Sequence, residues 1–174
     1  MQSAQAAVAQ PQIFTRAQWG ADESIRGTAP KYNSTIKAGF VHHTAGVNGY
    51  SEAEVPKILR GIYAYHVKGN GWSDIGYNFL VDRFGRLWEG RYGGMTRAVV
   101  GAHTGGFNVD SFAVSALGNY DKVAAPAVTR DWMLLRRCSR RCSRSLTRSF
   151  WASSRCRFAI VALRFVLMYG PRKR

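Results

Sequence analysis

The chain has 174 residues, of which 46% are hydrophobic and 13% aromatic. This length is enough for one ordinary domain with its own core, and the composition excludes a disordered chain. A formal net charge of +15 would normally indicate a nucleic acid or an anionic membrane as partner. However, residues 1–128 hold 12 Lys and Arg against 9 Asp and Glu, whereas residues 129–174 hold 13 against 1. The basic character therefore belongs to one C-terminal segment.

The N-terminal stretch MQSAQAAVAQPQ, residues 1–12, predicts a flexible linker rich in Gln and Ala. It lacks a basic start followed by an apolar core, so we expect no signal peptide. No apolar run reaches 18 residues, which argues against a transmembrane segment. All three cysteines lie in the basic segment, and their spacing fits neither a C-x-x-C pair nor a disulfide framework.

The next segments predict a strand followed by a helix. Residues 36–45, IKAGFVHHTA, are rich in strand-forming residues and end at Gly46. Residues 51–67 predict a helix, because the positions expected on its buried face repeat with helical spacing. Ser51 and Glu54 can form a capping box, whereas Pro56 favours a start near residue 55. The positions on that face are Val55, Ile58, Leu59, Ile62 and His66.

Residues 75–91, IGYNFLVDRFGRLWEGR, predict a β-hairpin whose turn ends at Gly85. Strand alternation would place Tyr77, Phe79 and Val81 on one side, and Asn78, Leu80 and Asp82 on the other. A glycine-rich loop follows, and residues 112–120, FAVSALGNY, predict a last strand. This order of elements indicates an α/β domain over residues 13–128, with a mixed central β-sheet flanked by helices.

The adjacent histidines of FVHHTAG are expected to face different surroundings. Neighbouring side chains on a strand face opposite ways, so His42 and His43 are not expected to share one metal ion. Imidazoles bind zinc well, and a site built from His42, His66 and His103 can be considered. The alternative is that these side chains are ordinary polar residues bonded to the backbone, and spacing alone leaves both interpretations open.

Four blocks together resemble the peptidoglycan recognition protein family. They are FTRAQWGAD, FVHHTAG, YHVKGNGWSDIGYNFLVDRFGRLWEGR and VVGAHTGGFNVDSFAVSALGNY, in this order, over about residues 13 to 126. That family shares its fold with the zinc N-acetylmuramoyl-L-alanine amidases similar to the T7 type. The resemblance implies hydrolysis of the amide bond between the lactyl group of N-acetylmuramic acid and L-alanine of the stem peptide.

The resemblance also assigns site residues. His42 corresponds to a ligand of Zn²⁺, and Tyr77 corresponds to a residue that assists catalysis beside the metal. The muropeptide groove is expected to be lined by His66, Trp72, Tyr77, His103 and Asn108, with His43 as a wall of the groove or of the core. A zinc ion can polarise the amide carbonyl and activate water, and a phenol can hydrogen-bond the developing oxyanion.

The C-terminal segment departs from the family pattern. The family takes its remaining zinc ligands from a late histidine and from a cysteine in a C-P-G-like turn, but this chain has no histidine after His103. Cys138, Cys142 and Cys156 are followed by Ser, Ser and Arg, never by Pro. We therefore expect an incomplete zinc site and impaired hydrolysis. A change of reading frame at about residues 128 to 131 would explain the basic, unpatterned tail over 129–174. Sequencing the coding DNA tests this, because another frame should restore both ligands.

Three functions remain open from the sequence. The first is a zinc-dependent amidase, the second a non-catalytic peptidoglycan-binding module, and the third a binder of nucleic acid or membrane through the basic tail. The tail lacks interleaved aromatic residues and an amphipathic helix, so it predicts no specific nucleic-acid site. We expect a monomer that binds peptidoglycan or a muropeptide in an extracellular or cell-wall setting, because peptidoglycan lies there.

Overall fold

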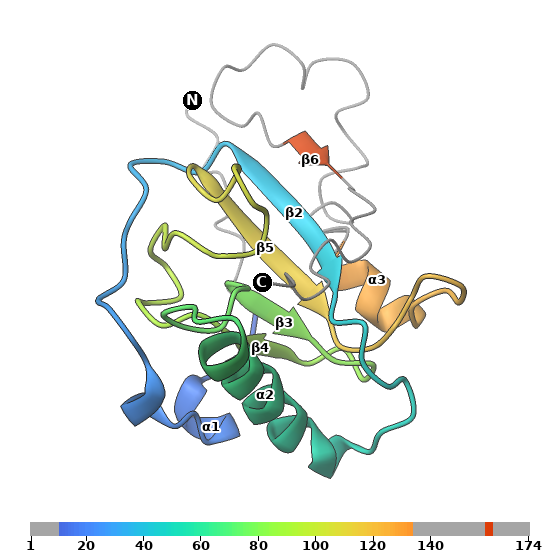
Figure 1. The fold of residues 1–174 in the computed structure, drawn as a ribbon. Helices are drawn as coiled ribbons and strands as arrows, with labels where there is room; N and C mark the ends of the chain where they lie inside the picture. Colours follow the sequence, from blue (N-terminus) through green and yellow to red (C-terminus); the bar gives the residue numbers. More distant parts are fainter. Residues whose placement is uncertain (1–10, 134–158, 162–174) are drawn as a thin grey trace, which may run out of the picture.

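The computed structural model describes residues 11–133 and 159–161. Figure 1 shows a twisted sheet with helices packed against it. The helical elements are α1 (Arg16–Trp19), η1 (Glu23–Ile25), η2 (Glu52–Glu54), α2 (Val55–Ala64), the π-helical turn η3 (Tyr65–Gly69) and α3 (Ala127–Met133). The strands are β1 (Ile13–Phe14), β2 (Ala38–His43), β3 (Phe79–Val81), β4 (Leu87–Glu89), β5 (Ser111–Ala116) and β6 (Ala159–Val161).

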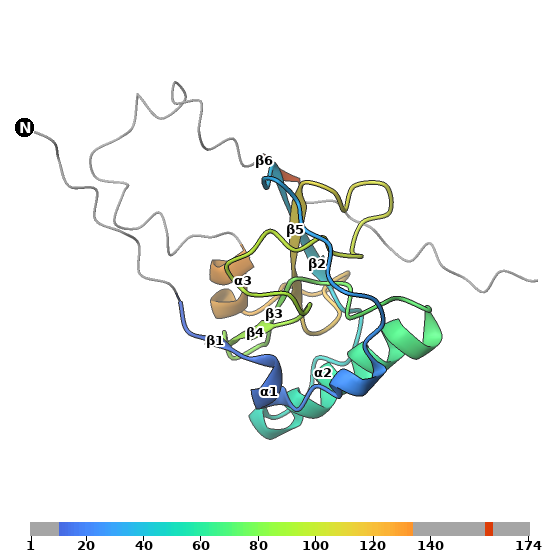
Figure 2. The same ribbon diagram turned by 90° about the vertical axis from the view of Figure 1, so that its left-hand side faces the viewer.

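The described strands form one mixed sheet in the order β1-β4-β3-β5-β2-β6. The hairpin strands β3 and β4 pair antiparallel, whereas β2 pairs parallel with both β5 and β6, and β5 also pairs parallel with β3. Figure 2 shows α1 and α2 on one face of this sheet and α3 on the other. The predicted α/β class with a mixed sheet is therefore confirmed.

The predicted strand over residues 36–45 forms as β2, with shorter ends. It lies beside β5 along its whole length, and the Cα partners pair His42 with Ser115 and His43 with Ala116. The backbone pairing continues one residue further, because the amide of Thr44 donates to the carbonyl of Ala116 at 2.9 Å. This pairing holds the two histidines at the end of an inner strand.

The predicted helix over residues 51–67 is built from three pieces. The backbone amide and the hydroxyl of Ser51 both donate to a carboxylate oxygen of Glu54, at 2.7 and 2.8 Å, so the predicted box caps the short η2 turn. The α-helix itself begins at Val55 and has Pro56 in its first turn, where the missing N–H costs nothing. Both sequence signals were therefore correct, and each marks a different start.

Two apolar clusters lie on opposite faces of the sheet. The larger one joins α1 and α2 to the sheet and includes Trp19, Tyr50, Val55, Leu59, Tyr63, Ile75, Leu80, Trp88 and Leu117. The smaller one includes Val81, Leu87, Val114 and Ala116. The face of α2 predicted from the sequence packs against the larger cluster. Tyr63 also lies on that face and is 1% exposed.

The prediction that Tyr77 shares a face with Phe79 and Val81 is wrong. Tyr77 packs against the larger cluster, whereas Phe79 and Val81 belong with the smaller one. The reason is that β3 begins only at Phe79, so strand alternation does not extend back to Tyr77. The intervening Asn78 is buried, and its side chain donates to the carbonyl of Val99 and accepts from the amide of Ala113.

The predicted domain boundary at residue 128 falls inside α3. The hydroxyl of Thr129 donates to the carbonyl of Asp82 at 3.0 Å, so this helix contacts the hairpin turn. The strand β6 lies within the predicted tail and pairs with β2. The rest of that tail, the cysteines and the linker up to residue 10 lie outside the described residues. Among the helices in the described part of the chain, none has the length and apolarity needed to cross a bilayer.

Candidate functional site

Five aromatic side chains predicted for the site form a continuous series of contacts on the α2 face of the sheet, which we call the ring row. The ring centroids of His103 and His42 are 5.7 Å apart, and the ring of Tyr77 lies 5.6 Å from that of His42. His66 lies 5.5 Å from Tyr77, and Trp72 lies 4.7 Å from His66. His66 is buried, and the other four rings are half-buried. The row therefore brings together four separate segments of the chain and remains reachable from outside.

The end of α2 places His66 and Trp72. The helix widens into the π-helical turn η3, and the amide of Trp72 donates back to the carbonyl of His66 at 3.0 Å. The Nδ1 atom of His66 accepts a hydrogen bond from the amide of Gly76 at 3.1 Å. A Cβ atom on Gly76 would lie 2.8 Å from both the Ala102 carbonyl oxygen and the Trp72 ring. Only glycine allows the chain to pass this closely beneath the indole.

The loop over residues 101–110 places His103. The side-chain oxygen of Asn108 accepts hydrogen bonds from the amides of His103 and Thr104, at 2.8 and 2.9 Å. The Thr104 hydroxyl lies 3.0 Å from Nδ1 of His103 and 3.3 Å from Nε2 of His42, so it bridges the two imidazoles. Asn108 thus shapes the loop through its oxygen, and its contact with a ligand stays a prediction.

Burial controls the electrostatics of the ring row. Desolvation lowers the pKa of His42 and of His66 to about 4, and that of His103 to about 3. The positive charges of neighbouring groups act in the same direction. Burial also raises the pKa of Tyr77. At neutral pH the row therefore presents uncharged imidazoles and a protonated phenol, which recognise ligands by hydrogen bonding and stacking.

Two polar atoms beside the row are buried without a hydrogen-bond partner in the described part of the chain. They are the Ser115 hydroxyl and Nε2 of His103. Ser115 is the register partner of His42, and Thr104 bridges His42 to His103. Neither residue was predicted from the sequence. Strand alternation within residues 112–120 could have placed Ser115 on one face, but no sequence signal says which face meets His42.

The side chain of His43 lies apart from the ring row. Its Nδ1 atom accepts a hydrogen bond from the amide of Tyr120 at 2.8 Å, and its Nε2 lies 3.6 Å from a carboxylate oxygen of Asp121. Tyr120 packs against the smaller cluster, on the sheet face opposite the ring row. His43 therefore lies apart from the ring row, and its expected role as a wall of the groove or of the core stays a prediction.

The zinc site considered for His42, His66 and His103 does not form. Across residues 11–133 and 159–161, no three His, Cys, Asp or Glu side chains lie close enough together to hold a metal ion. His66 is separated from His42 by the Tyr77 ring, and its Nδ1 is engaged by Gly76. A catalytic zinc ion normally has three protein ligands. The described donors therefore do not fit zinc, and the role of His42 as a ligand stays a prediction.

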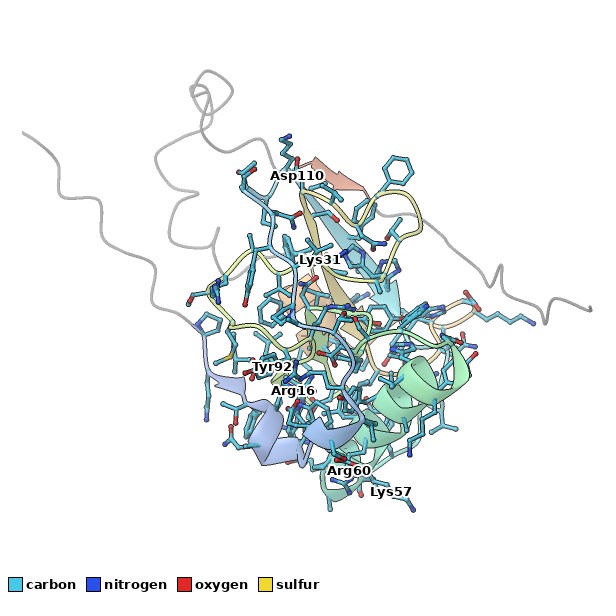
Figure 3. All side chains as sticks on the ribbon, turned by 60° about the vertical axis from the view of Figure 1, so that its left-hand side comes forward. Arg16, Lys31, Lys57, Arg60, Tyr92 and Asp110 are labelled. Carbon is cyan, nitrogen blue, oxygen red and sulfur yellow. The ribbon has the colours of Figure 1, made fainter. Side chains whose placement is uncertain are left out.

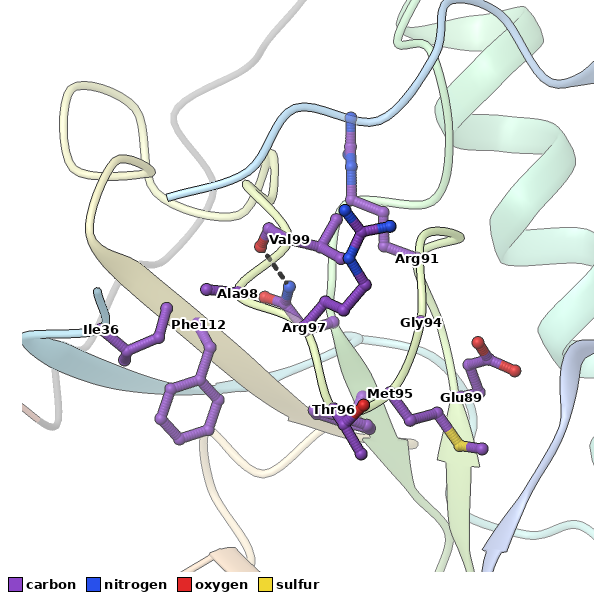
Figure 4. A pocket seen from close by; sticks show the side chains of 12 residues that line it. Ile36, Glu89, Arg91, Gly94, Met95, Thr96, Arg97, Ala98, Val99 and Phe112 are labelled. Carbon is purple, nitrogen blue, oxygen red and sulfur yellow. Dashed lines mark hydrogen bonds between the residues drawn. The ribbon is translucent and has the colours of Figure 1, made fainter. Parts of the chain in front are cut away.

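A separate pocket of about 330 Å³ lies away from the ring row, and none of the predicted site residues lines it. Figure 4 shows Phe112 and Ile36 on one side and Met95 and Glu89 on the other. The hydrogen bond from the Asn78 side chain to the Val99 carbonyl joins two residues that line this pocket. The pocket is therefore a feature of the loop before β5 and does not extend the candidate site.

Comparisons with known proteins identify relatives of this chain. No protein-family model matches the chain. Peptidoglycan-recognition protein SC2 of Drosophila simulans is 38% identical over 109 residues, which make up 63% of this chain and 56% of that relative. The chain thus spans little more than half the length of the curated relatives it matches.

Solved structures match over a larger share. Peptidoglycan recognition protein-LE in complex with tracheal cytotoxin, a monomeric diaminopimelic acid-type peptidoglycan, is 29% identical with a TM-score of 0.63, over 75% of this chain and 73% of that one. The structure of bumblebee PGRP-SA has a TM-score of 0.63 and 30% identity, and the match covers 76% of this chain and 77% of that one. With this identity over most of a solved relative, the chain belongs to the peptidoglycan recognition protein family.

Proposed function

We propose that this chain binds peptidoglycan fragments along the ring row. The observation that carries the proposal is the convergence of His42, Tyr77, His66, Trp72 and His103 on one face of the sheet. Half-buried, uncharged aromatic rings with a few polar atoms suit a ligand made of sugars and a short peptide. The solved complex of a relative with tracheal cytotoxin supports the same ligand class.

Amide hydrolysis is a second candidate function, favoured by one observation. The ring of Tyr77 lies 5.6 Å from that of His42, as the amidase resemblance requires. The described residues supply only His42 of the expected zinc ligands, and no metal-binding group of three side chains forms among them. Binding without hydrolysis is therefore the function that the described geometry supports best. Either activity implies an extracytoplasmic setting, where the ligand lies.

A pair of neighbouring variants tests the binding proposal. Titration calorimetry of the full chain with a disaccharide–pentapeptide fragment should give a measurable Kd. His42→Ala should weaken binding about tenfold or more, as expected for a central contact residue. His43→Ala is the matched control, because its side chain packs on the other face of the sheet. Equal effects of the two variants, with both folded by circular dichroism, would refute the proposed location.

Metal content separates binding from hydrolysis. Elemental analysis of the purified chain should find no tightly bound zinc, and incubation with the fragment should leave its lactyl–alanine bond intact. One zinc ion per chain, together with cleavage that a chelator suppresses, would instead establish the amidase. That result would require ligands from outside the described residues.

A further inference from the structure

Two large apolar side chains are exposed on the same loop that carries His103. Phe107 is 67% exposed and Val109 is 71% exposed. A single exposed apolar residue needs no explanation, but an exposed aromatic ring beside a binding site is typical of contact residues.

The backbone fixes Phe107 through a tight turn. The amide of Phe107 donates to the carbonyl of Thr104 at 2.9 Å, and Gly106 between them has a φ of 81°. A positive φ at the third residue is what a type II β-turn requires, and such a turn keeps its first and last Cα atoms within about 7 Å. The hydroxyl of Ser111 also donates to the carbonyl of Phe107 at 2.6 Å.

This turn places Phe107 next to the ring row. Thr104, at the start of the turn, lies 3.3 Å from Nε2 of His42 through its hydroxyl. At the other end of the loop, the amide of Asp110 donates to the side chain of Asn33, and its carboxylate pairs with Lys37 at 2.6 Å. Figure 3 shows Asp110 at the end of the molecule remote from Lys57 and Arg60 of α2. Phe107 therefore lies one turn away from Thr104, the residue that bridges His42 and His103.

The two ends of the row differ in charge. At the Trp72 end, the guanidinium of Arg91 donates to the hydroxyl of Ser73 at 2.8 Å. At the Phe107 end, the nearest charged side chain on the loop is Asp110, which is already paired with Lys37. The charged groups of a stem peptide therefore suit the Trp72 end, and an uncharged ligand surface suits Phe107.

We propose that Phe107 is a stacking platform for a pyranose ring in the glycan part of a peptidoglycan fragment. The inference rests on the proposed function of the ring row. A pyranose face presents C–H bonds with a slight positive charge, and the face of a phenyl ring is negative, so the two attract. Because stacking needs no hydrogen-bond partner, it explains why an apolar ring is held in the open at this position.

The test compares two ligands on the full chain. A competition assay measures Kd for a disaccharide–pentapeptide and for the sugar-free pentapeptide. Phe107→Ala should weaken binding of the first about two- to tenfold, the range of one aromatic contact, and leave the second unchanged. Phe107→Tyr should keep wild-type affinity for both ligands, because the ring face is retained. Val109→Ala, on the same loop, is the matched control and should change neither.

The possible outcomes separate failure of the stacking proposal from failure of the proposed function. Equal losses for the two ligands would overturn the glycan assignment, because Phe107 would then act on the fold or on the peptide. Unchanged affinity for the disaccharide ligand would overturn it as well. If the wild-type chain binds neither ligand, the proposed function itself fails. If it binds both and responds to His42→Ala but not to Phe107→Ala, only the stacking proposal fails.

Discussion

Replacing Asp82 by alanine removes the acceptor around which the β3–β4 turn is built. Asp82 is fully buried, and one of its carboxylate oxygens accepts from the amides of Phe84 and Arg86, both at 2.9 Å. The other accepts from the side chain of Arg86 at 2.7 Å and from the indole N–H of Trp88 at 3.0 Å. One carboxylate thus satisfies four donors.

The expected cost follows from the donors that lose their partner. The indole N–H of Trp88 lies in the core, and leaving a buried donor unpaired costs about 1–3 kcal/mol. The turn amides of Phe84 and Arg86 are only part-buried, so water can replace the carboxylate there at a smaller cost. Arg86 keeps its second partner Glu52 at 3.0 Å, which limits the loss from the broken ion pair. We expect Asp82→Ala to lower the free energy of unfolding by about 3–5 kcal/mol.

Urea unfolding followed by tryptophan fluorescence measures this change. Asp82→Asn keeps an acceptor for the turn amides but turns a donor towards the guanidinium and the indole. It should therefore cost about 2 kcal/mol, less than Asp82→Ala. Asp121→Ala removes an exposed carboxylate and should stay within about 0.5 kcal/mol of wild type. A loss below about 1 kcal/mol for Asp82→Ala would refute the reasoning, because the four hydrogen bonds would then contribute almost nothing.

Three further predictions concern the ring row. Trp72→Ala should weaken binding of the disaccharide–pentapeptide about tenfold or more in calorimetry, whereas Tyr32→Ala, an aromatic truncation outside the row, should not. Gly76→Ala should lower the melting temperature and the affinity together, since overpacking costs about 1–3 kcal/mol. Gly105→Ala is its control, because a Cβ atom there would lie within 4 Å of no other atom. An unchanged melting temperature for Gly76→Ala would contradict the close approach of Gly76 to Trp72 and Ala102. His66 has a pKa lowered to about 4 by burial, so its stabilising effect is complete above the unfolded pKa of about 6.5 and is lost as pH falls towards 4. Urea unfolding between pH 7.5 and 5 should show this decline, and His66→Asn should make it shallower; an equal slope in both proteins would count against it.

Short-range regularities in the sequence determined much of this fold. The period of two in residues 38–43 separated His42 from His43, and the two imidazoles do lie on opposite faces. The helical spacing after Ser51 identified the buried face of α2. The hairpin was recognisable because its turn needs glycine at a positive φ, which Gly85 provides at 82°. All of these depend on residues that are near neighbours along the chain, where backbone geometry alone sets the direction of each side chain.

The composition of the site was decided by contacts between distant segments. Tyr77 faces His42 because β3 begins only at Phe79, so strand alternation, which had grouped the phenol with Phe79 and Val81, does not reach it. Thr104 reaches His42 from 62 positions further along the chain. No periodic pattern carries such information, since it depends on how the loop before β5 folds over the sheet. The sequence determined which residue types were available, and tertiary packing decided which of them meet, because side chains from different elements are brought together only when a common core is buried.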